Sequence, residues 1–313
     1  MGRADQVLRP GSGIKNLEID VKIRLMENFR ALFYAPYYAI HALGFYAREG
    51  VDVELVSSHA PGDAIAHLTN GTIDLTWGGP MRVMTAHDRD EQSPLVCFGE
   101  VVSRDPFFLI GNVDRFELSD LAHLRFATVS EVPTPWMCLQ QDLRDAAIDP
   151  AMIPRVHDRT MPDNYTALRE NELDVMQAFE PFVSRAEIEQ AGTVLYAASS
   201  RGPTVYTSFI TTRNKAAAHR DALLAVTRAL AKMQGWLTAH NGTELAEAVA
   251  AFFPDVPQEL LARSLQRYLD AGLWARDTAM SRQGFDRLGL SFLSGGALRR
   301  PPVFETCVDS SLD

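Results

Sequence analysis

A short structural unit occurs twice in this sequence, about a hundred residues apart. In each copy a helical segment is followed by an apolar–aspartate pair that begins a strand, and a proline after the strand starts the next helix. The pairs are Ile73-Asp74 and Leu173-Asp174, and the prolines are Pro80 and Pro181. Because helix, strand and proline recur in one order with the aspartate in the same place, the repeat predicts two lobes of similar build.

The segments around the first copy predict an α/β fold. Residues 21–26 alternate apolar and polar side chains as a strand does, a helical pattern covers 37–49, and a second strand follows at 51–55. A strand–helix–strand order with a crossover of this length is typical of a parallel pair. From residue 216 onward the pattern is mainly helical, and the tail from Arg299 is expected to wrap the surface or to be disordered.

Two apolar segments are candidates for carrying the chain between the lobes. They are the strands expected at 101–112 and at 207–214. We therefore expect residues 21–112 and 207–313 to form lobe I, residues 113–206 to form lobe II, and residues 1–20 to be an N-terminal extension. Each lobe should be a mixed sheet flanked by helices.

Composition excludes several function classes. The 30 basic and 40 acidic residues give a formal net charge of −10, with no Lys/Arg block that could follow a phosphate backbone, so we expect no nucleic-acid partner. Three cysteines without ligand spacing predict neither a disulfide framework nor a zinc site. The eight histidines form no metal motif, and no P-loop, GxGxxG or GxSxG occurs, so no metal or cofactor is expected.

The sequence also bears on location. Residues 1–20 contain no apolar segment typical of a secretory leader, and no apolar run is long enough to span a membrane. We expect a cytoplasmic protein if Met1 is the native start and a periplasmic protein if a leader has been removed.

Three segments near the start carry a family resemblance. They are residues 33–39 (FYAPYYA), 44–53 (GFYAREGVDV) and 71–75 (GTIDL), and later landmarks follow at 119–121, 126–129 and 179–183. Over nearly the whole chain the sequence resembles ABC-transporter solute-binding proteins of the nitrate, sulfonate and thiamine-pyrimidine-precursor type. The resemblance implies a periplasmic-binding-protein-like fold of type II, in which a small-molecule ligand is held in a cleft between two lobes and an ABC permease is a possible partner.

The same fold also hosts enzymes, so a second hypothesis stays open. The resemblance extends to the fungal thiamine-pyrimidine synthase, whose pattern places a Lys and a His after the first repeated strand and a Cys-rich run later. This chain has Trp77 to Arg82 at the first place and no Cys-rich run. A cytosolic lyase-like or biosynthetic enzyme acting on a small aromatic substrate would need a base or nucleophile such as Glu180, Cys138 or His41.

Strand ends and helix starts supply the predicted ligand site. Aromatic residues gather there, among them Phe33 and Tyr37, and flat ligands stack on such rings. Gly78 and Gly79 either let a ligand approach the backbone or only serve a tight turn. Residues 128–131, with Thr134 after them, either face the cleft or cap a helix. The predicted ligand-binding residues are Tyr34, Tyr38, Trp77, Gly78, Gly79, Arg104, Thr128, Ser130, Phe179, Glu180 and Tyr206.

The expected class of ligand depends on the role of Glu180. Its carboxylate either caps the helix that follows or accepts a hydrogen bond from a ring N–H or amine of the ligand. In the second role it would repel a purely anionic ligand, unless Arg104 or Arg82 compensates. We therefore expect a small aromatic or heterocyclic ligand rather than nitrate.

Overall fold

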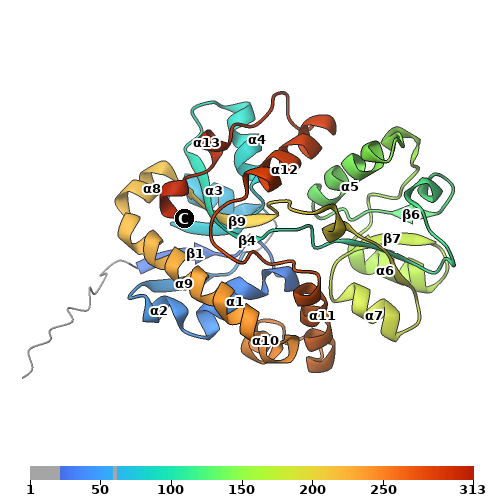
Figure 1. Ribbon diagram of the computed structural model, residues 1–313, viewed down its shortest axis with the longest axis horizontal. Coiled ribbons are helices and arrows are strands. Elements are labelled where there is room, and N and C mark those ends of the chain that lie inside the picture. The colour runs from blue at the N-terminus through green and yellow to red at the C-terminus, as the bar shows by residue number, and fades with distance from the viewer. Residues whose placement is uncertain (1–21, 59–61) are drawn as a thin grey trace, which may run out of the picture.

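Two lobes, each built around one β-sheet, make up the protein. The computed structural model describes residues 22–58 and 62–313 and shows the lobes side by side (Figure 1). The predicted N-terminal extension at 1–20 lies outside the described residues. The structure confirms the α/β class and the arrangement of two mixed sheets flanked by helices.

The sheet of lobe I has five strands. Their spatial order is β2 (Asp52–Val56), β1 (Lys22–Met26), β3 (Leu75–Gly78), β9 (Thr207–Thr212) and β4 (Leu95–Val102). β1 is parallel to β2 and β3, whereas β9 is antiparallel to both β3 and β4. The lobe therefore contains one strand, β9, that the chain contributes after it has passed through lobe II.

Helices cover both faces of this sheet. Those from the N-terminal half are α1 (Ala35–Ala42), α2 (Phe45–Arg48), α3 (Asp63–Thr69) and α4 (Met81–Arg89). Those from the C-terminal half are α8 (Arg213–Ala218), α9 (Arg220–Ala239), α10 (Gly242–Val249), α11 (Gln258–Asp270), α12 (Arg282–Ser294) and α13 (Phe304–Cys307). Within the described residues, no helix combines the length and the apolar content needed to cross a bilayer.

The sheet of lobe II has four strands. They lie in the order β6 (Phe126–Ala127), β7 (Val175–Ala178), β5 (Phe108–Gly111) and β8 (Thr193–Ala197). The helices of this lobe are α5 (Thr134–Asp145), α6 (Met161–Arg169) and α7 (Phe182–Ile188). β5 pairs with β7 and β8, although the sequence placed residues 107–112 in lobe I. An apolar run reveals a strand but not its partner, so we propose that lobe II begins at Phe108.

The two repeated aspartates make the same hydrogen bond in the two lobes. The Asp74 carboxylate accepts a hydrogen bond from the backbone N–H of Arg24 at 2.9 Å, and Asp174 accepts one from the backbone N–H of Arg125 at 2.7 Å. Each aspartate thus fixes the start of a strand against its parallel neighbour. This common hydrogen bond gives the physical basis of the repeat.

The two crossing segments pair with each other between the lobes. The backbone N–H of Tyr206 donates to the carbonyl of Val102 at 2.8 Å, and that of Thr204 donates to Ser103 at 2.8 Å. Farther along, Ala198 N donates to the carbonyl of Phe107 at 3.0 Å. Residues 103–107 and 198–206 are therefore one two-stranded connection rather than two separate linkers.

Two expected segments differ from the sequence interpretation. The helix expected over 37–49 is divided into α1 and α2 by Gly44, whose φ of 70° lies in the left-handed region. The tail is ordered rather than disordered, because Cys307, Val308 and Leu312 are buried against lobe I. The Asp313 carboxylate also accepts a hydrogen bond from the backbone N–H of Gly99 at 2.9 Å.

A buried carboxyl group on β4 makes stability depend on pH. Glu100 is 2% exposed, and burial raises its pKa from 4.5 to about 7, with smaller contributions from Asp277 and Asp313. One carboxylate oxygen accepts from Ser281 N at 2.7 Å, while the other has no partner among the described residues. The folded state therefore favours the neutral acid.

We predict that Glu100→Gln stabilises the protein at pH 8. A raised folded-state pKa gives stability that is complete below the unfolded pKa and is lost as pH rises through the folded pKa. At 1.36 kcal/mol per pKa unit, the loss between pH 4.5 and 7 is about 3 kcal/mol, and the variant should not show it. Urea unfolding at a series of pH values from below 4.5 up to 8 measures the effect. Glu247→Gln, at an exposed carboxylate on α10, should keep the wild-type slope; a wild-type slope in Glu100→Gln would contradict the prediction.

Candidate functional site

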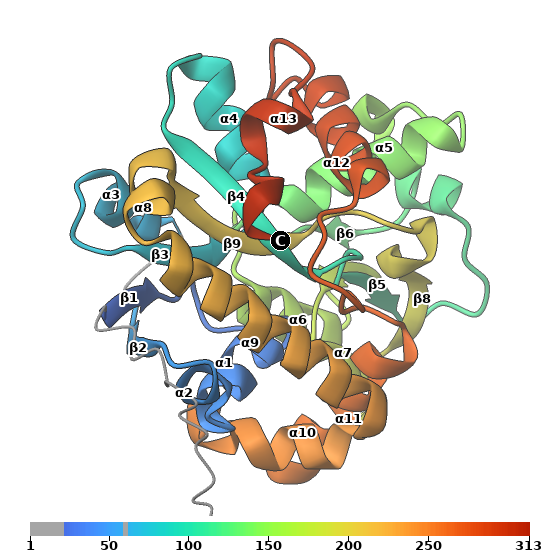
Figure 2. The same cartoon turned by 60° about the vertical axis from the view of Figure 1, so that its left-hand side comes forward.

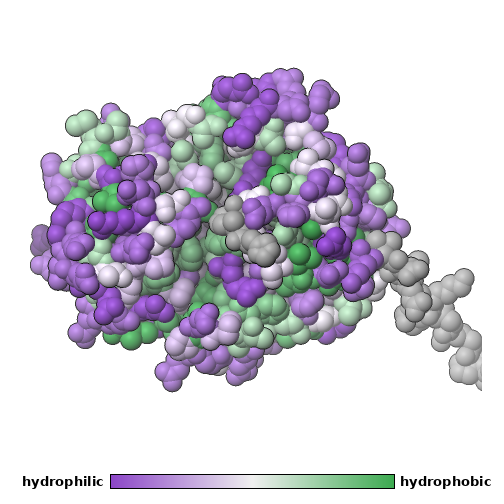
Figure 3. All heavy atoms as spheres, turned by 180° about the vertical axis from the view of Figure 1, so that it is seen from behind, coloured by the Kyte–Doolittle hydropathy of each residue, from purple (hydrophilic) through white to green (hydrophobic). Residues whose placement is uncertain are grey.

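A cavity of about 200 Å³ lies between the two lobes. It lies beyond the carboxyl ends of β1 and β3, at the first turns of α4 and α5, and beside both crossing segments. Its lining residues are Asn28, Phe29, Phe33, Tyr34, Gly79, Met81, Arg82, Phe107, Glu131, Val132, Pro133, Thr134 and Tyr206. We call this the interlobe cavity. Figure 3 shows the molecule from behind, with polar side chains over both lobes and more apolar ones between them.

Arg82, in the first turn of α4, brings a positive charge into the interlobe cavity. Its side chain is partly buried, and among the described residues its guanidinium makes no hydrogen bond or ion pair. Burial lowers the pKa of Arg82 and the nearby Tyr34 raises it, but an arginine remains charged in proteins. Gly62, with a φ of 96°, leaves room for this group, since a Cβ there would lie 2.9 Å from Arg82 Nη1.

Two tyrosines of the lining carry buried hydroxyl groups, and that of Tyr34 lies near Arg82. Tyr206 is 6% exposed, and its buried hydroxyl has no hydrogen-bond partner among the described residues. The hydroxyl oxygen of Tyr34 accepts a hydrogen bond from Asn28 Nδ2 at 3.1 Å, so its own hydrogen is available to donate. Burial raises the pKa of Tyr34 to about 12, and it therefore stays protonated at neutral pH. The guanidinium and the Tyr34 hydroxyl are donors suited to an anionic group.

Aromatic rings form the wall of the interlobe cavity that lies beside the two crossing segments. Phe33 and Phe107 have centroids 6.4 Å apart, and each lies 6.3 Å from the ring of Tyr206. Phe179 packs edge-on against Phe33 and Phe107, with ring centroids 5.3 and 5.2 Å apart. This predicted residue therefore supports the wall from behind and does not line the cavity.

Glu131 is the acidic group of the lining. It comes from lobe II, just before α5, and its side chain is exposed. One carboxylate oxygen accepts from the backbone N–H of Met161 at 2.8 Å, and the other lies 3.5 Å from Ser130 Oγ. This second oxygen has lone pairs free for a ligand N–H. The cavity thus offers a cation from one lobe and a carboxylate from the other.

The structure brings together only part of the predicted ligand site. Tyr34, Gly79 and Tyr206 line the interlobe cavity. Trp77 and Tyr38 are instead buried in lobe I, where Trp77 stacks on Tyr37 at 4.6 Å and Tyr38 donates to Glu27 at 2.6 Å. The Trp77 side chain leaves β3 on the face that packs against α1, and Tyr38 lies on α1 itself.

Glu180 takes the helix-capping alternative. Its carboxylate is fully buried and accepts hydrogen bonds from Ser184 N at 2.9 Å, Ser264 Oγ at 3.2 Å and Arg267 Nε at 2.7 Å. Because α11 carries Ser264 and Arg267, the carboxylate also joins lobe II to lobe I. It does not line the interlobe cavity, and its oxygens are already occupied.

Four further predicted residues lie outside the lining. Arg104 donates to the carbonyl of Ser199 at 2.9 Å within the crossing connection. Thr128 is fully buried, and its hydroxyl accepts from Arg155 at 2.7 Å. Ser130 is exposed beside Glu131, and Gly78 lies at the end of β3 against the Arg82 side chain.

Several lining residues were missed as site residues. Arg82 entered the sequence interpretation only as a group that could compensate Glu180, and Glu131 and Thr134 only as part of a turn. Asn28 and Phe29 lie within three residues of the end of β1, so their place after a parallel strand was the available signal. Within the described residues, no cluster of three or more His, Cys, Asp or Glu side chains could hold a metal ion.

Comparison with known proteins agrees with this fold. The model of the family described as NMT1/THI5 like matches residues 33–243. The candidate binding protein YtlA of Bacillus subtilis (strain 168) is 21% identical over 302 residues, covering 95% of this chain and 90% of that protein. These matches confirm the resemblance seen in the sequence.

Solved structures show the same architecture. The periplasmic aliphatic sulphonate binding protein SsuA from Escherichia coli superposes with a TM-score of 0.73 at 15% identity, over 91% of this chain and 96% of that one. The periplasmic nitrate-binding protein NrtA from Synechocystis PCC 6803 gives a TM-score of 0.68 at 12% identity, over 93% and 86%. At these identities the likeness establishes the fold.

We predict that Glu180→Gln destabilises the folded protein by about 3 kcal/mol, because it removes one partner of a buried ion pair between the segment before α7 and Arg267 on α11. Chemical denaturation measures the loss. Glu187→Gln is the matched control, since Glu187 also pairs with Arg267 but is more exposed, and its effect should be smaller. Unchanged stability in Glu180→Gln together with weaker solute binding would show instead that the carboxylate reaches the ligand.

Proposed function

The chain belongs to the NMT1/THI5-like family, and we propose that it is the solute-binding component of an ABC importer that captures a small anionic solute in the interlobe cavity. One observation carries the proposal: the Arg82 guanidinium lies in this cavity without a partner among the described residues. A partly buried charge is unfavourable unless it is paired, and a bound anion would pair it.

The lining also supports a flat solute with an N–H group. The rings of Phe33, Phe107 and Tyr206 offer the apolar faces that the sequence led us to expect, and the volume is below the 300–1,000 Å³ typical of drug-sized ligands. Glu131 takes the role that the sequence assigned to Glu180, that of a carboxylate which accepts from a ligand N–H. We infer an anionic group at Arg82, a small planar body, and an amine or ring N–H at Glu131.

The relatives bear on the anion and on the transport role. Two structural neighbours are a sulphonate-binding and a nitrate-binding protein, and both ligands are anions. A solute that contacts both Arg82 of lobe I and Glu131 of lobe II would favour the form in which the two lobes are closed on it. In this proposal the permease recognises that closed form. In this proposal the protein works on the periplasmic side, where these neighbours act.

The enzyme hypothesis gains no support from the residues it requires. Glu180 is held in its ion pair, and the thiol of Cys138 is buried, which raises its pKa to about 12. His41 lies on α1, where its ring packs edge-on against Phe252 at 6.4 Å. None of the three lines the interlobe cavity.

We predict that Arg82→Gln weakens binding of an anionic solute by about ten- to a hundred-fold, because it removes a charge-assisted hydrogen bond. Calorimetric titration with benzoate and ethanesulfonate measures the affinity. The free protein should keep its melting temperature, since Arg82 makes no bond to the described protein. Arg104→Gln is the matched control, and its affinity should stay at the wild-type value. Equal losses in both variants, or none in Arg82→Gln, would refute the proposed anion site.

We predict further that Glu131→Gln acts only on solutes with an N–H group. Binding of 4-aminobenzoate should weaken by about ten-fold, whereas binding of benzoate should stay the same or improve, because a like charge is removed. The ratio of the two affinities in wild type and variant isolates the N–H contact. A parallel loss for both solutes would assign Glu131 to lobe II structure through its bond to Met161.

A further inference from the structure

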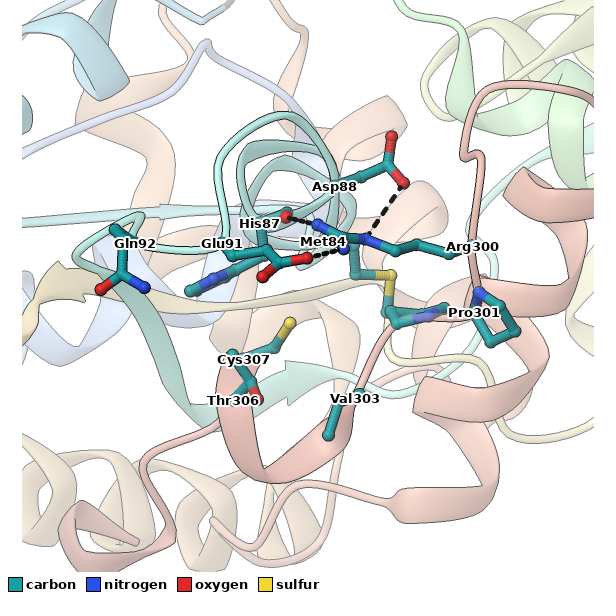
Figure 4. Close-up of a pocket in the computed structure, with 11 residues that line it drawn as sticks. Met84, His87, Asp88, Glu91, Gln92, Arg300, Pro301, Val303, Thr306 and Cys307 are labelled. Atoms are coloured by element: carbon teal, nitrogen blue, oxygen red, sulfur yellow. Dashed lines mark hydrogen bonds and ion pairs between the residues drawn. The ribbon is translucent and has the colours of Figure 1, made fainter.

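A second cavity, of about 350 Å³, lies in lobe I between the last turns of α4 and the C-terminal segment (Figure 4). Its lining includes Met84, His87, Arg300, Pro301, Val303 and Cys307. We propose that this α4–α13 cavity is a second ligand site, for a neutral aromatic molecule that carries one O–H or N–H donor. The proposal does not depend on the proposed transport function.

His87 supplies the polar contact. The ring is 8% exposed, and its Nε2 lies 2.9 Å from the carbonyl oxygen of Leu95. A carbonyl only accepts, so Nε2 carries the hydrogen and Nδ1 of the neutral ring is an acceptor. Nδ1 is buried and has no partner among the described residues. A buried acceptor without a partner is unfavourable, and a ligand O–H or N–H would satisfy it.

Sulfur and apolar atoms favour an aromatic body. Met84 and Cys307 are both 1% exposed, and burial raises the pKa of the Cys307 thiol to about 12, so it remains neutral. Thioether and thiol groups make favourable contacts with aromatic rings. Pro301 and Val303 extend this apolar surface towards solvent.

The charged groups at the rim are already paired, which favours a neutral ligand. Arg300 donates to the carbonyl of His87 at 2.9 Å and forms ion pairs with Asp88 and Glu91 (Figure 4). Asp88 also pairs with Arg299 at 3.0 Å. An ionic ligand would have to replace one of these partners, whereas a neutral one leaves them in place.

The test uses the full chain with ¹⁵N-labelled histidine and phenol as the probe. Anisole, which has the same ring but no donor, is the control ligand. Phenol should shift the His87 Nδ1 resonance, assigned with a His87→Gln variant, and should bind about ten-fold more tightly than anisole. Thr306→Trp should fill the cavity and abolish the shift, whereas Glu305→Trp, on the same helix but outside the lining, should keep it.

Two results would overturn the proposal. One is a His87 resonance that does not respond to phenol, which would mean that water alone satisfies Nδ1. The other is equal binding of phenol and anisole, or binding that survives in Thr306→Trp. The ligand comparison needs only the wild-type chain, so it decides the question even if the tryptophan variant fails to fold.

Discussion

The buried guanidinium of Arg201 holds the two crossing segments together. It pairs with Asp105 of the first crossing at 2.5 Å and with Asp142 on α5, and all three side chains are at most 5% exposed. Separating such charges inside the protein would leave one unpaired, at a cost of several kcal/mol. The crossings therefore cannot slide past each other here, and the position of the interlobe cavity, which both crossings line, depends on this cluster.

Two contacts between the lobes flank this cluster. On one side α12 packs on α5, where Arg287 reaches Asp142 at 3.1 Å (Figure 2). On the other side α11 packs on α7 through Arg267 and Glu180. Both contacts combine ion pairs with apolar packing, since Cys138 of α5 lies in one core cluster with Phe292 of α12, and Val183 of α7 lies in one with Leu265 of α11. Together with the Arg201 cluster, these contacts set the separation of the cavity walls, with Arg82 on one lobe and Glu131 on the other.

The sequence predicted those helices and strands that depend on residues close together in the chain. The repeated aspartates, the prolines that start α4 and α7, and strand alternation depend on neighbouring residues, so the repeat and both lobes could be recognised without a structure. Placing Phe108 in the right sheet requires knowledge of strand partners, which no local pattern contains. The division of α1 from α2 was also missed, since a glycine such as Gly44 within a helical pattern has no single interpretation.

The site side chains were harder to predict because a strand end does not fix where a side chain points. Trp77 and Glu180 stand at strand ends, yet one packs against α1 and the other against α11. What distinguishes Arg82 is visible only in three dimensions. Arg201 and Arg267 are buried together with carboxylates, whereas Arg82 reaches the interlobe cavity without one. Among the described residues, Arg82 thus brings a guanidinium without a hydrogen bond or ion pair to the interlobe cavity, and an anion bound there would add to the stability of the folded state.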